Sequence, residues 1–246
     1  MAALRAAVTI GVLAVPAALI LKQPDLGTTL LVMASGLAVI FFAGLSWKLI
    51  VPPVLLGLVG VVILIAMEPQ WCAPDVDWRV LHEYQRQRVC TLLDPFKDPL
   101  GKGFHIIQGM IAIGSGGVWG KGFMQGTQTH LEFIPERTTD FIFAAFSEEF
   151  GLVGTLGLMA AFLFLLIRGL IIAVEAPTLF SRLVAAAMTA NFFVYAFVNM
   201  GMVSGILPVV GVPLPFISYG GTAMVTLGVC LGILMSVAKS KRLMQS

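Results

Sequence analysis

The stretch FIFAAFSEEFGLVGTLGLMAAFLFLLI, residues 141–167, is almost wholly apolar, and its only charged side chains are Glu148 and Glu149. A helix that crosses a bilayer needs about 20 predominantly apolar residues, and this stretch meets that requirement. Five other stretches also meet it. The six predicted spans are residues 3–21, 26–46, 49–67, 141–167, 180–203 and 217–238. We therefore expect an all-α fold, a polytopic integral membrane bundle of about six helices in which residues 1–246 form one domain.

The composition excludes two other classes of protein. Hydrophobic residues make up 58% of the chain and charged residues 11%, whereas about a quarter of the residues of a soluble domain are charged. Disordered chains combine low hydrophobicity with high charge, which is the opposite of this composition. The net charge of +2 offers no basic patch, so nucleic acid is not an expected partner.

Basic residues in the short connections indicate how the chain is oriented, because cytoplasmic loops carry an excess of Lys and Arg. In the short connections on one side of the predicted bundle, only Lys22 is basic. The basic residues of the other side are Arg5, Lys48, Arg168, Arg182, Lys239, Lys241 and Arg242. We therefore expect both termini to be cytoplasmic and the long loop 68–140 to lie outside.

The loop 68–140 holds most of the chain's polar chemistry. It carries 7 of the 15 basic residues, 9 of the 13 acidic residues and all three histidines. Cys72 and Cys90 both lie in it, and an oxidising location permits a disulfide between them without requiring one. The histidines lack metal-ligand spacing.

The glycine-rich run GSGGVWGKG, residues 114–122, does not match a nucleotide-binding motif. It has neither the P-loop spacing nor G-x-G-x-x-G. The pattern is typical of a flexible re-entrant or interfacial loop, although its backbone N–H groups and Lys121 could bind a phosphate.

Carboxylates mark the most informative positions. Pro135 suits the first position of a helix, so we expect the fourth helix to start near it and Asp140 to lie about one turn inside. That helix would carry Glu136, Asp140, Glu148 and Glu149, and Asp25 lies at the outer mouth of the second span. Ionisable groups at membrane depth are costly and usually face a polar cavity or a partner. Each carboxylate alone fits an ion pair between packed helices, but the set together favours an outward-facing polar site of an enzyme or a transporter.

Six strings of the sequence are distinctive: QPDLGT (23–28), DPLGKGFHIIQGMIAIGSGG (98–117), GKGFMQGTQ (120–128), LEFIPERTTDFIFA (131–144), SEEFGLVG (147–154) and NMGMVSGILPVVGVPLPFISYGG (199–221). Together they resemble the SEDS family (shape, elongation, division, sporulation), and most closely its RodA-type, rod-shape branch. The resemblance begins at about residue 5. The family is built from about ten spans, so we expect this chain to correspond to the C-terminal two-thirds, without roughly the first four helices.

The resemblance implies a peptidoglycan glycosyltransferase that polymerises lipid II during cell elongation and rod-shape maintenance. Its implied partners are a class B penicillin-binding protein and the elongation machinery, in the bacterial cytoplasmic (inner) membrane. Asp140 matches the family's catalytic aspartate. Lys121, Arg137 and a divalent cation, Mg²⁺ or Mn²⁺, are candidates to stabilise the diphosphate. The other predicted substrate-binding residues are Asp25, Glu136, Glu148 and Glu149. A lipid II flippase and a non-catalytic scaffold for the penicillin-binding protein are the alternatives.

Overall fold

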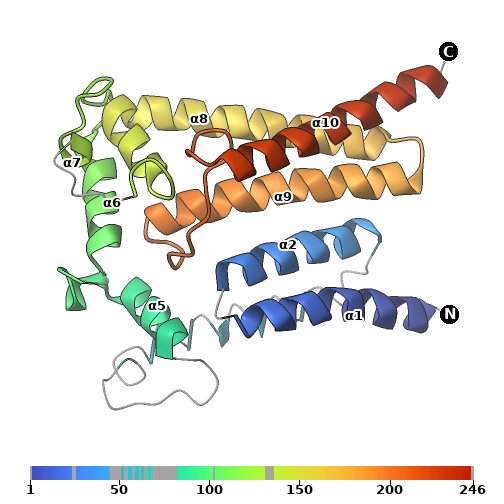
Figure 1. Ribbon diagram of the computed structural model, residues 1–246, viewed down its shortest axis with the longest axis horizontal. Coiled ribbons are helices and arrows are strands. Elements are labelled where there is room, and N and C mark those ends of the chain that lie inside the picture. Colours follow the sequence, from blue (N-terminus) through green and yellow to red (C-terminus); the bar gives the residue numbers. More distant parts are fainter. Residues whose placement is uncertain are drawn as a thin grey trace.

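The computed structural model describes residues 2–23, 26–44, 83–101, 103–130 and 136–244, with short pieces between 51 and 72. Every regular element in these ranges is a helix, which confirms the predicted all-α class (Figure 1). The elements are α1 (Ala2–Leu21), α2 (Leu26–Phe42), α5 (Glu83–Leu93), the 3-10 helix η1 (Pro95–Lys97), α6 (Phe104–Ser115), α7 (Thr127–His130), α8 (Ile142–Glu175), α9 (Leu179–Val203) and α10 (Gly221–Met244).

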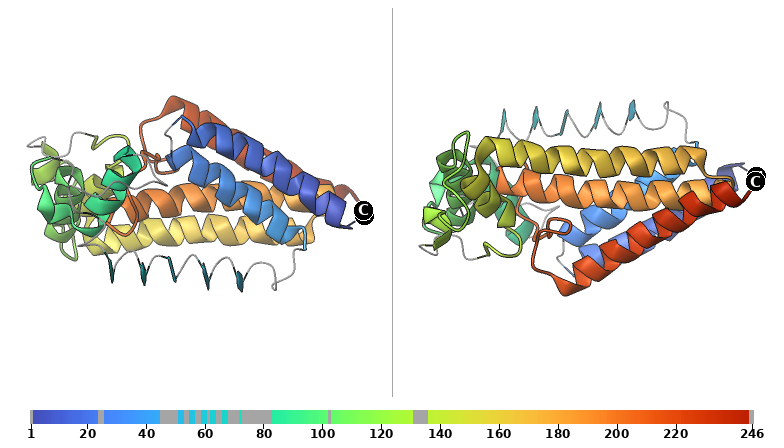
Figure 2. Two further views of the ribbon diagram at one scale, coloured as in Figure 1. Left: turned by 90° about the horizontal axis from the view of Figure 1, so that it is seen from below. Right: turned by 90° about the horizontal axis from the view of Figure 1, so that it is seen from above.

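The helices form an elongated bundle with two different ends. Helix α9 packs against α8 on one side and α2 on the other, α1 packs against α2, and α10 lies across α8 and α9. Figures 1 and 2 show α5, α6 and α7 gathered at one end, which we call the loop end. The N- and C-termini both lie at the opposite end, which we call the terminal end.

Three helices of the described residues, α8, α9 and α10, are long and apolar enough to cross a membrane. Shorter apolar helices cover residues 11–21, 27–42 and 104–115. About half of the predicted span 49–67 lies outside the described residues. The three long helices follow the hydropathy of the sequence, because a helix satisfies its own backbone polar groups and therefore tolerates a hydrocarbon environment.

Several helix boundaries differ from the predicted ones, and two of the differences have a clear physical cause. Helix α8 continues beyond residue 167 to Glu175, because a single charged residue such as Arg168 does not end a helix. The residue that follows its last turn, Ala176, has an extended backbone (φ −62°, ψ 138°) and directly precedes Pro177. An extended conformation is expected for a residue before proline. Helix α10 begins at Gly221 rather than 217, because Ser218 bonds back to residues outside that helix.

Helix α8 is interrupted at Gly151, whose φ of 63° and ψ of −163° are accessible almost only to glycine. The glycine loop, residues 116–122, supplies hydrogen bonds at this break. Leu152 N and Val153 N donate to the carbonyls of residues 117 and 118 at 2.9 and 3.1 Å, and the N–H groups of residues 121 and 122 donate to those of 148 and 149 at 3.0 Å. The loop that the sequence predicted to be flexible is thus bonded on both sides of the break.

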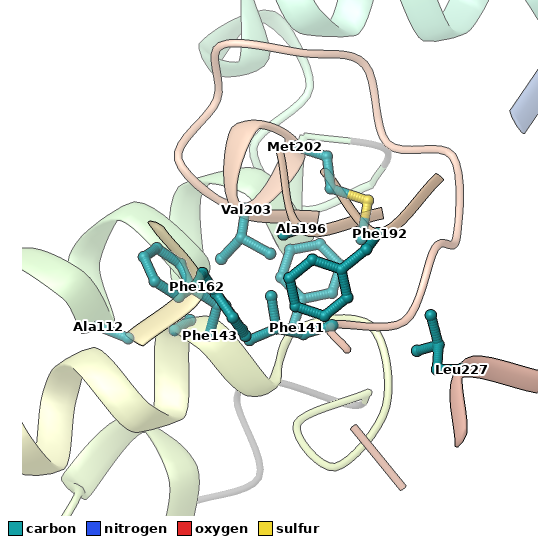
Figure 3. Close-up of a cluster of buried hydrophobic side chains, with 11 residues drawn as sticks. Ala112, Phe141, Phe143, Phe162, Phe192, Ala196, Met202, Val203 and Leu227 are labelled. Atoms are coloured by element: carbon teal, nitrogen blue, oxygen red, sulfur yellow. The ribbon is translucent and has the colours of Figure 1, made fainter. Parts of the chain in front are cut away.

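The larger hydrophobic core lies at the loop end, where α6, α8, α9 and the 204–216 connection meet (Figure 3). Phe141 is 1% exposed and Met202 is completely buried. Phe162 and Phe192 pack edge to face with their ring centroids 5.7 Å apart. Phe141, which belongs to this core, directly follows Asp140 in the chain. The core therefore fixes the segment that carries the predicted catalytic residue.

Candidate functional site

Asp140 lies in a turn, residues 136–141, which we call the Asp140 turn. Phe141 N donates to Glu136 O at 3.0 Å and closes the turn. Three consecutive carbonyl oxygens of the turn accept hydrogen bonds from segments far along the chain. Tyr219 N donates to Thr138 O (2.8 Å), Ser218 Oγ to Thr139 O (2.6 Å) and Asn199 Nδ2 to Asp140 O (2.8 Å).

These hydrogen bonds explain why the predicted helix start near Pro135 is wrong. A helix would need the carbonyls of residues 138–140 to accept from N–H groups four residues later, and α9 and the segment before α10 already occupy them. Asp140 therefore precedes α8, whose first residue is Ile142. The prediction that Glu136, Asp140, Glu148 and Glu149 share one helix is also wrong, because the first two lie in the turn.

The same distant residues are themselves fixed. Asn199 is fully buried, and its Nδ2 also donates to Val212 O at 2.6 Å. Ser218 Oγ accepts from Leu214 N at 2.7 Å. Neither Asn199 nor Ser218 was predicted from the sequence to support the site. Asn199 stands in an otherwise apolar span, which was an available signal, since polar groups inside membrane helices usually have a structural or functional partner.

The Asp140 carboxyl group is half-buried and closely approached by the chain. A Cβ atom on Gly211 would lie 3.2 Å from Asp140 Oδ2, and Gly211 has a φ of +71°, so glycine suits this position on both counts. Burial raises the pKa of Asp140, and Glu136 raises this pKa further through its charge and a side-chain hydrogen bond. A carboxylate with a raised pKa accepts a proton more readily at neutral pH, which is a property of general bases.

Arg137 and Glu149 line one cavity of about 240 Å³, together with Thr138 of the Asp140 turn. Its aromatic lining residues are Phe123, Phe146 and Phe150. Two of the predicted substrate-binding residues, of opposite charge, are therefore brought to one hollow that adjoins the Asp140 turn.

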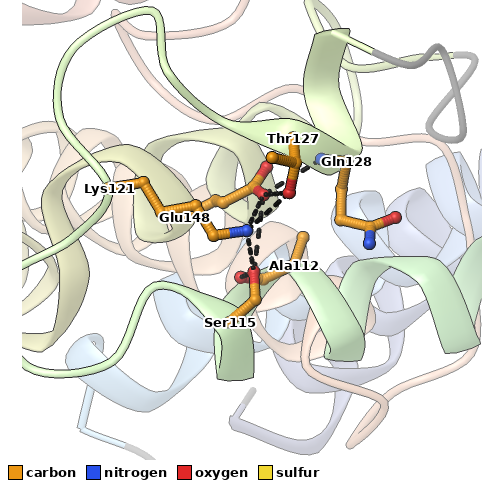
Figure 4. A network of polar contacts seen from close by, with 6 residues as sticks. All are labelled: Ala112, Ser115, Lys121, Thr127, Gln128 and Glu148. Carbon is orange, nitrogen blue, oxygen red and sulfur yellow. Dashed lines mark hydrogen bonds and ion pairs between the residues drawn. The ribbon is translucent and has the colours of Figure 1, made fainter.

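Lys121 and Glu148 meet in a separate network (Figure 4). The Glu148 side chain is fully buried, that of Lys121 is 26% exposed, and Lys121 Nζ lies 2.6 Å from Glu148 Oε1. Three further donors reach the same oxygen: Gln128 N (3.0 Å), Thr127 Oγ1 (3.1 Å) and Ser115 Oγ (3.4 Å). Glu148 thus matches the ion-pair alternative, and a contact between Lys121 and substrate stays a prediction.

The remaining expected residues lie elsewhere. Asp25 and His82 are outside the described residues. His105 lies in α6, with its ring 5.9 Å from that of Phe141.

Cys72 and Cys90 form a disulfide, with their Cα atoms 5.7 Å apart. The sequence permitted this bond without requiring it.

A second cavity of about 510 Å³ lies between α5, α6 and the 204–216 connection. Arg88 of α5 lines it and donates from Nη1 to Val209 O at 2.7 Å. His105 and Asp98 also line it. Val209 is two residues from Gly211, so this cavity and the Asp140 carboxyl group share one short segment of chain.

An all-helical bundle of long apolar helices, with the Asp140 turn and its neighbouring charged side chains at the loop end, defines an integral membrane protein with a polar site at that end. The chain belongs to the FtsW/RodA/SpoVE family of cell cycle proteins, whose model matches residues 3–243. This membership confirms the resemblance seen in the sequence.

Curated relatives are similar over most of this chain. It is 54% identical over 229 residues to the peptidoglycan glycosyltransferase MrdB of Escherichia coli K12, which covers 93% of this chain and 59% of the relative. It is 43% identical over 159 residues to the peptidoglycan glycosyltransferase RodA of Treponema pallidum, covering 65% of this chain and 37% of the relative. The chain thus spans about three-fifths of the length of the E. coli relative.

Two solved structures share the fold. One, from a study of the coordination of polymerization and crosslinking by a peptidoglycan synthase complex, has a TM-score of 0.68 and 34% identity, and covers 97% of this chain and 62% of the other. The second is a mutant of the rod shape determining protein RodA of Thermus thermophilus, with a TM-score of 0.56, 26% identity and coverage of 97% and 57%.

Proposed function

We propose that this chain carries the catalytic part of a peptidoglycan glycosyltransferase that polymerises lipid II, an undecaprenyl-diphosphate-linked disaccharide peptide. Family membership and the names of the relatives support this proposal. The observation that carries it is Asp140, a half-buried carboxyl group with a raised pKa on a turn whose backbone accepts three hydrogen bonds from two distant segments.

The proposed reaction needs one base. A hydroxyl oxygen of the acceptor sugar attacks the anomeric carbon of the donor, and the bond from that carbon to the diphosphate oxygen breaks. Asp140 accepts the hydroxyl proton, and the lipid diphosphate leaves with the electron pair of the broken bond. A glycosidase needs a second carboxyl group to protonate its leaving group, whereas a diphosphate leaves as a stable anion.

Cationic groups near the Asp140 turn would stabilise the diphosphate. Arg137 lies in the turn and lines the adjoining 240 Å³ cavity, so its guanidinium group suits a bidentate contact with phosphate oxygens. Lys121 is a further candidate, although Glu148 already balances its charge. In this proposal Glu149 lines the same cavity and binds polar groups of the substrate, and Asp25 remains a candidate for that role.

A divalent cation, Mg²⁺ or Mn²⁺, is part of the proposal. Within the described ranges, no group of three or more His, Cys, Asp or Glu side chains could hold a metal ion. Mg²⁺ is commonly bound by one or two carboxylates together with substrate phosphates, and Glu136, beside the proposed base Asp140, fits that donor set. When bound there, the cation would neutralise charge on the diphosphate.

We place the protein in the bacterial cytoplasmic (inner) membrane with both termini cytoplasmic and α5, α6 and α7 outside. The bias of Lys and Arg supports this orientation, and so does the position of both termini at one end of the bundle (Figure 1). The proposed partner is a class B penicillin-binding protein of the elongation machinery, since one structural neighbour comes from a synthase complex that couples polymerization to crosslinking.

The flippase alternative depends on Glu148 and Glu149 at membrane depth. Glu148 is fully buried beneath Lys121 and three other donors, so its burial is explained without a transport role. The scaffold alternative predicts binding of the partner without polymerisation.

Replacement of Asp140 by Asn tests the base. We expect Asp140→Asn to lower the rate of lipid II polymerisation by a factor of about 10² to 10⁴. The measurement uses labelled lipid II, the partner, and this chain joined to the N-terminal helices of the E. coli relative.

Ionised Asp140 is disfavoured in the fold because its folded pKa is raised, so its contribution to stability falls as pH rises through that pKa. Asp140→Asn should therefore melt at pH 7 no lower than the wild type.

The three functions give different results in this experiment. Wild-type turnover in Asp140→Asn would exclude Asp140 as the base. Movement of lipid II across vesicles without glycan chains would indicate the flippase, and co-purification of the partner without either activity would indicate the scaffold.

A further inference from the structure

A cleft of about 910 Å³ lies between the C-terminal parts of α8 and α10, remote from the Asp140 turn. Figures 1 and 2 show these parts of the two helices at the terminal end of the bundle. Apolar side chains of both helices line the cleft, including Ile171, Ile172 and Met235. Its charged lining residues are Arg168, Glu175 and Lys239.

The charged residues of the cleft lie at the membrane interface opposite the loop end. At 1.5 Å per residue, Arg168 is about 39 Å along α8 from Ile142, and Lys239 is about 27 Å along α10 from Gly221. The hydrocarbon core is about 30 Å thick. Arg168 therefore reaches the headgroup region of the second leaflet, which is the cytoplasmic leaflet in the proposed orientation. The long side chain of Lys239 can extend to the same region from just below it.

The shape and charge of the cleft together select a ligand. Arg168 and Lys239 against Glu175 leave a net charge of +1, which complements a phosphodiester of charge −1. Exposed Ile171 and Met235 offer an apolar surface that faces lipid. Basic pockets between transmembrane helices on the cytoplasmic side are typical sites for phospholipid headgroups.

We propose that this cleft binds the headgroup of an anionic phospholipid of the phosphatidylglycerol type. The phosphodiester oxygens accept hydrogen bonds from the Arg168 guanidinium and the Lys239 ammonium, which are strong because both partners are charged. The headgroup hydroxyls donate to Glu175, whose two carboxylate oxygens offer several acceptor sites. The acyl chains lie along Ile171 and Met235. This binding does not depend on the chemistry at Asp140.

The test measures lipid binding to the purified chain by native mass spectrometry and by the lipid-dependent shift in melting temperature. The lipids are phosphatidylglycerol, phosphatidylethanolamine and phosphatidylcholine, with inorganic phosphate as the soluble anion. We expect phosphatidylglycerol to bind more tightly than the two zwitterionic lipids. We also expect inorganic phosphate to bind far more weakly, because it lacks acyl chains.

Substitutions locate the site. Arg168→Gln and Lys239→Gln should each weaken phosphatidylglycerol binding about fivefold, which corresponds to about 1 kcal/mol per cation near the membrane surface, and the double variant about 25-fold. Arg182→Gln is the matched control, because Arg182 is also exposed near the start of α9 but does not line the cleft.

Three results would overturn the proposal. These are an equal loss of binding in Arg182→Gln, equal binding of phosphatidylglycerol and phosphatidylcholine, and binding of inorganic phosphate as tight as that of the lipid. Circular dichroism and size-exclusion profiles of each variant confirm that it is folded before binding is compared.

Discussion

At Asp140 the backbone and the side chain are controlled by different parts of the chain. Asn199 donates to the carbonyl of Asp140 at 2.8 Å and so fixes the position of the residue. Glu136 acts on the carboxyl group, whose pKa it helps to raise. Position and proton affinity can therefore be changed separately by mutation.

Glu136→Gln changes the proton affinity of Asp140. Asp140 acts as a base only when ionised, so activity falls as pH drops through its raised pKa. Removal of the Glu136 charge takes away one cause of that shift, and the acid limb of the pH–rate profile should move to lower pH. Polymerisation rates between about pH 4 and 8 measure this shift. An unmoved acid limb would show that Asp140 is not the group that titrates in the rate.

The ion pair between Lys121 and Glu148 stabilises the fold and takes no part in proton transfer. Lys121→Met leaves a fully buried carboxylate without its cation, and breaking a buried ion pair costs about 3 to 5 kcal/mol. We expect a loss in the free energy of unfolding near the lower value, because the Lys121 side chain is 26% exposed. Chemical denaturation in detergent measures it.

The control and the double variant make this stability prediction specific. Glu149→Gln, one residue further along and only half-buried, should change stability by less than about 0.5 kcal/mol. Lys121→Met combined with Glu148→Met should be more stable than Lys121→Met alone, because the unpaired charge is gone. A double variant as unstable as the single one would show that the ion pair is not the cause.

Among the elements, α8 departs most from a regular membrane helix. Its break at Gly151 is bonded on both sides by the glycine loop, so the first turns of the helix are fixed to the loop end. Sequence patterns did not reveal this pairing, because the two segments lie about 30 residues apart and the glycine run resembles an ordinary loop. The turn before α8 was missed for a similar reason, since its carbonyls bond to α9 and to residues before α10.

Gly151→Ala tests the break. Its backbone conformation costs a non-glycine residue about 1 to 3 kcal/mol, and a Cβ atom there would clash with Gly120 N. We expect a loss of stability of at least that size. Gly157→Ala is the matched control in the same helix, because a Cβ atom at Gly157 meets nothing within 4 Å. Equal melting temperatures for the two variants would contradict the structural role of Gly151.

For the whole molecule, hydropathy was sufficient to predict the class of fold. Long apolar runs can cross a bilayer only as helices or closed barrels, and α8, α9 and α10 follow such runs within a few residues at most ends. Asp140 and the glycine loop were more difficult, because tertiary hydrogen bonds decide their conformation. The family resemblance selected Asp140, whereas the roles of Asn199 and Ser218 required coordinates.

The orientation of the whole molecule gives a labelling prediction. With Cys230 replaced by Ala, Leu100→Cys should react with an impermeant thiol reagent on intact spheroplasts, because Leu100 is 90% exposed and lies in the predicted outer loop. Pro177→Cys, in the exposed connection between α8 and α9, should react only after permeabilisation. The reverse labelling pattern would show that the chain has the opposite orientation to the proposed one.

The bond from Tyr219 N to the carbonyl of Thr138 has a mechanical consequence, because Tyr219 lies two residues before α10. Helix α10 has 24 residues and is therefore a rod of about 36 Å. Tilting such a rod by about 5° around its far end displaces its near end by about 3 Å, which is the length of a hydrogen bond. A tilt of that size would be enough to break the bond from Tyr219 N to Thr138 O, so the geometry of the Asp140 turn depends on the angle at which α10 crosses the bundle.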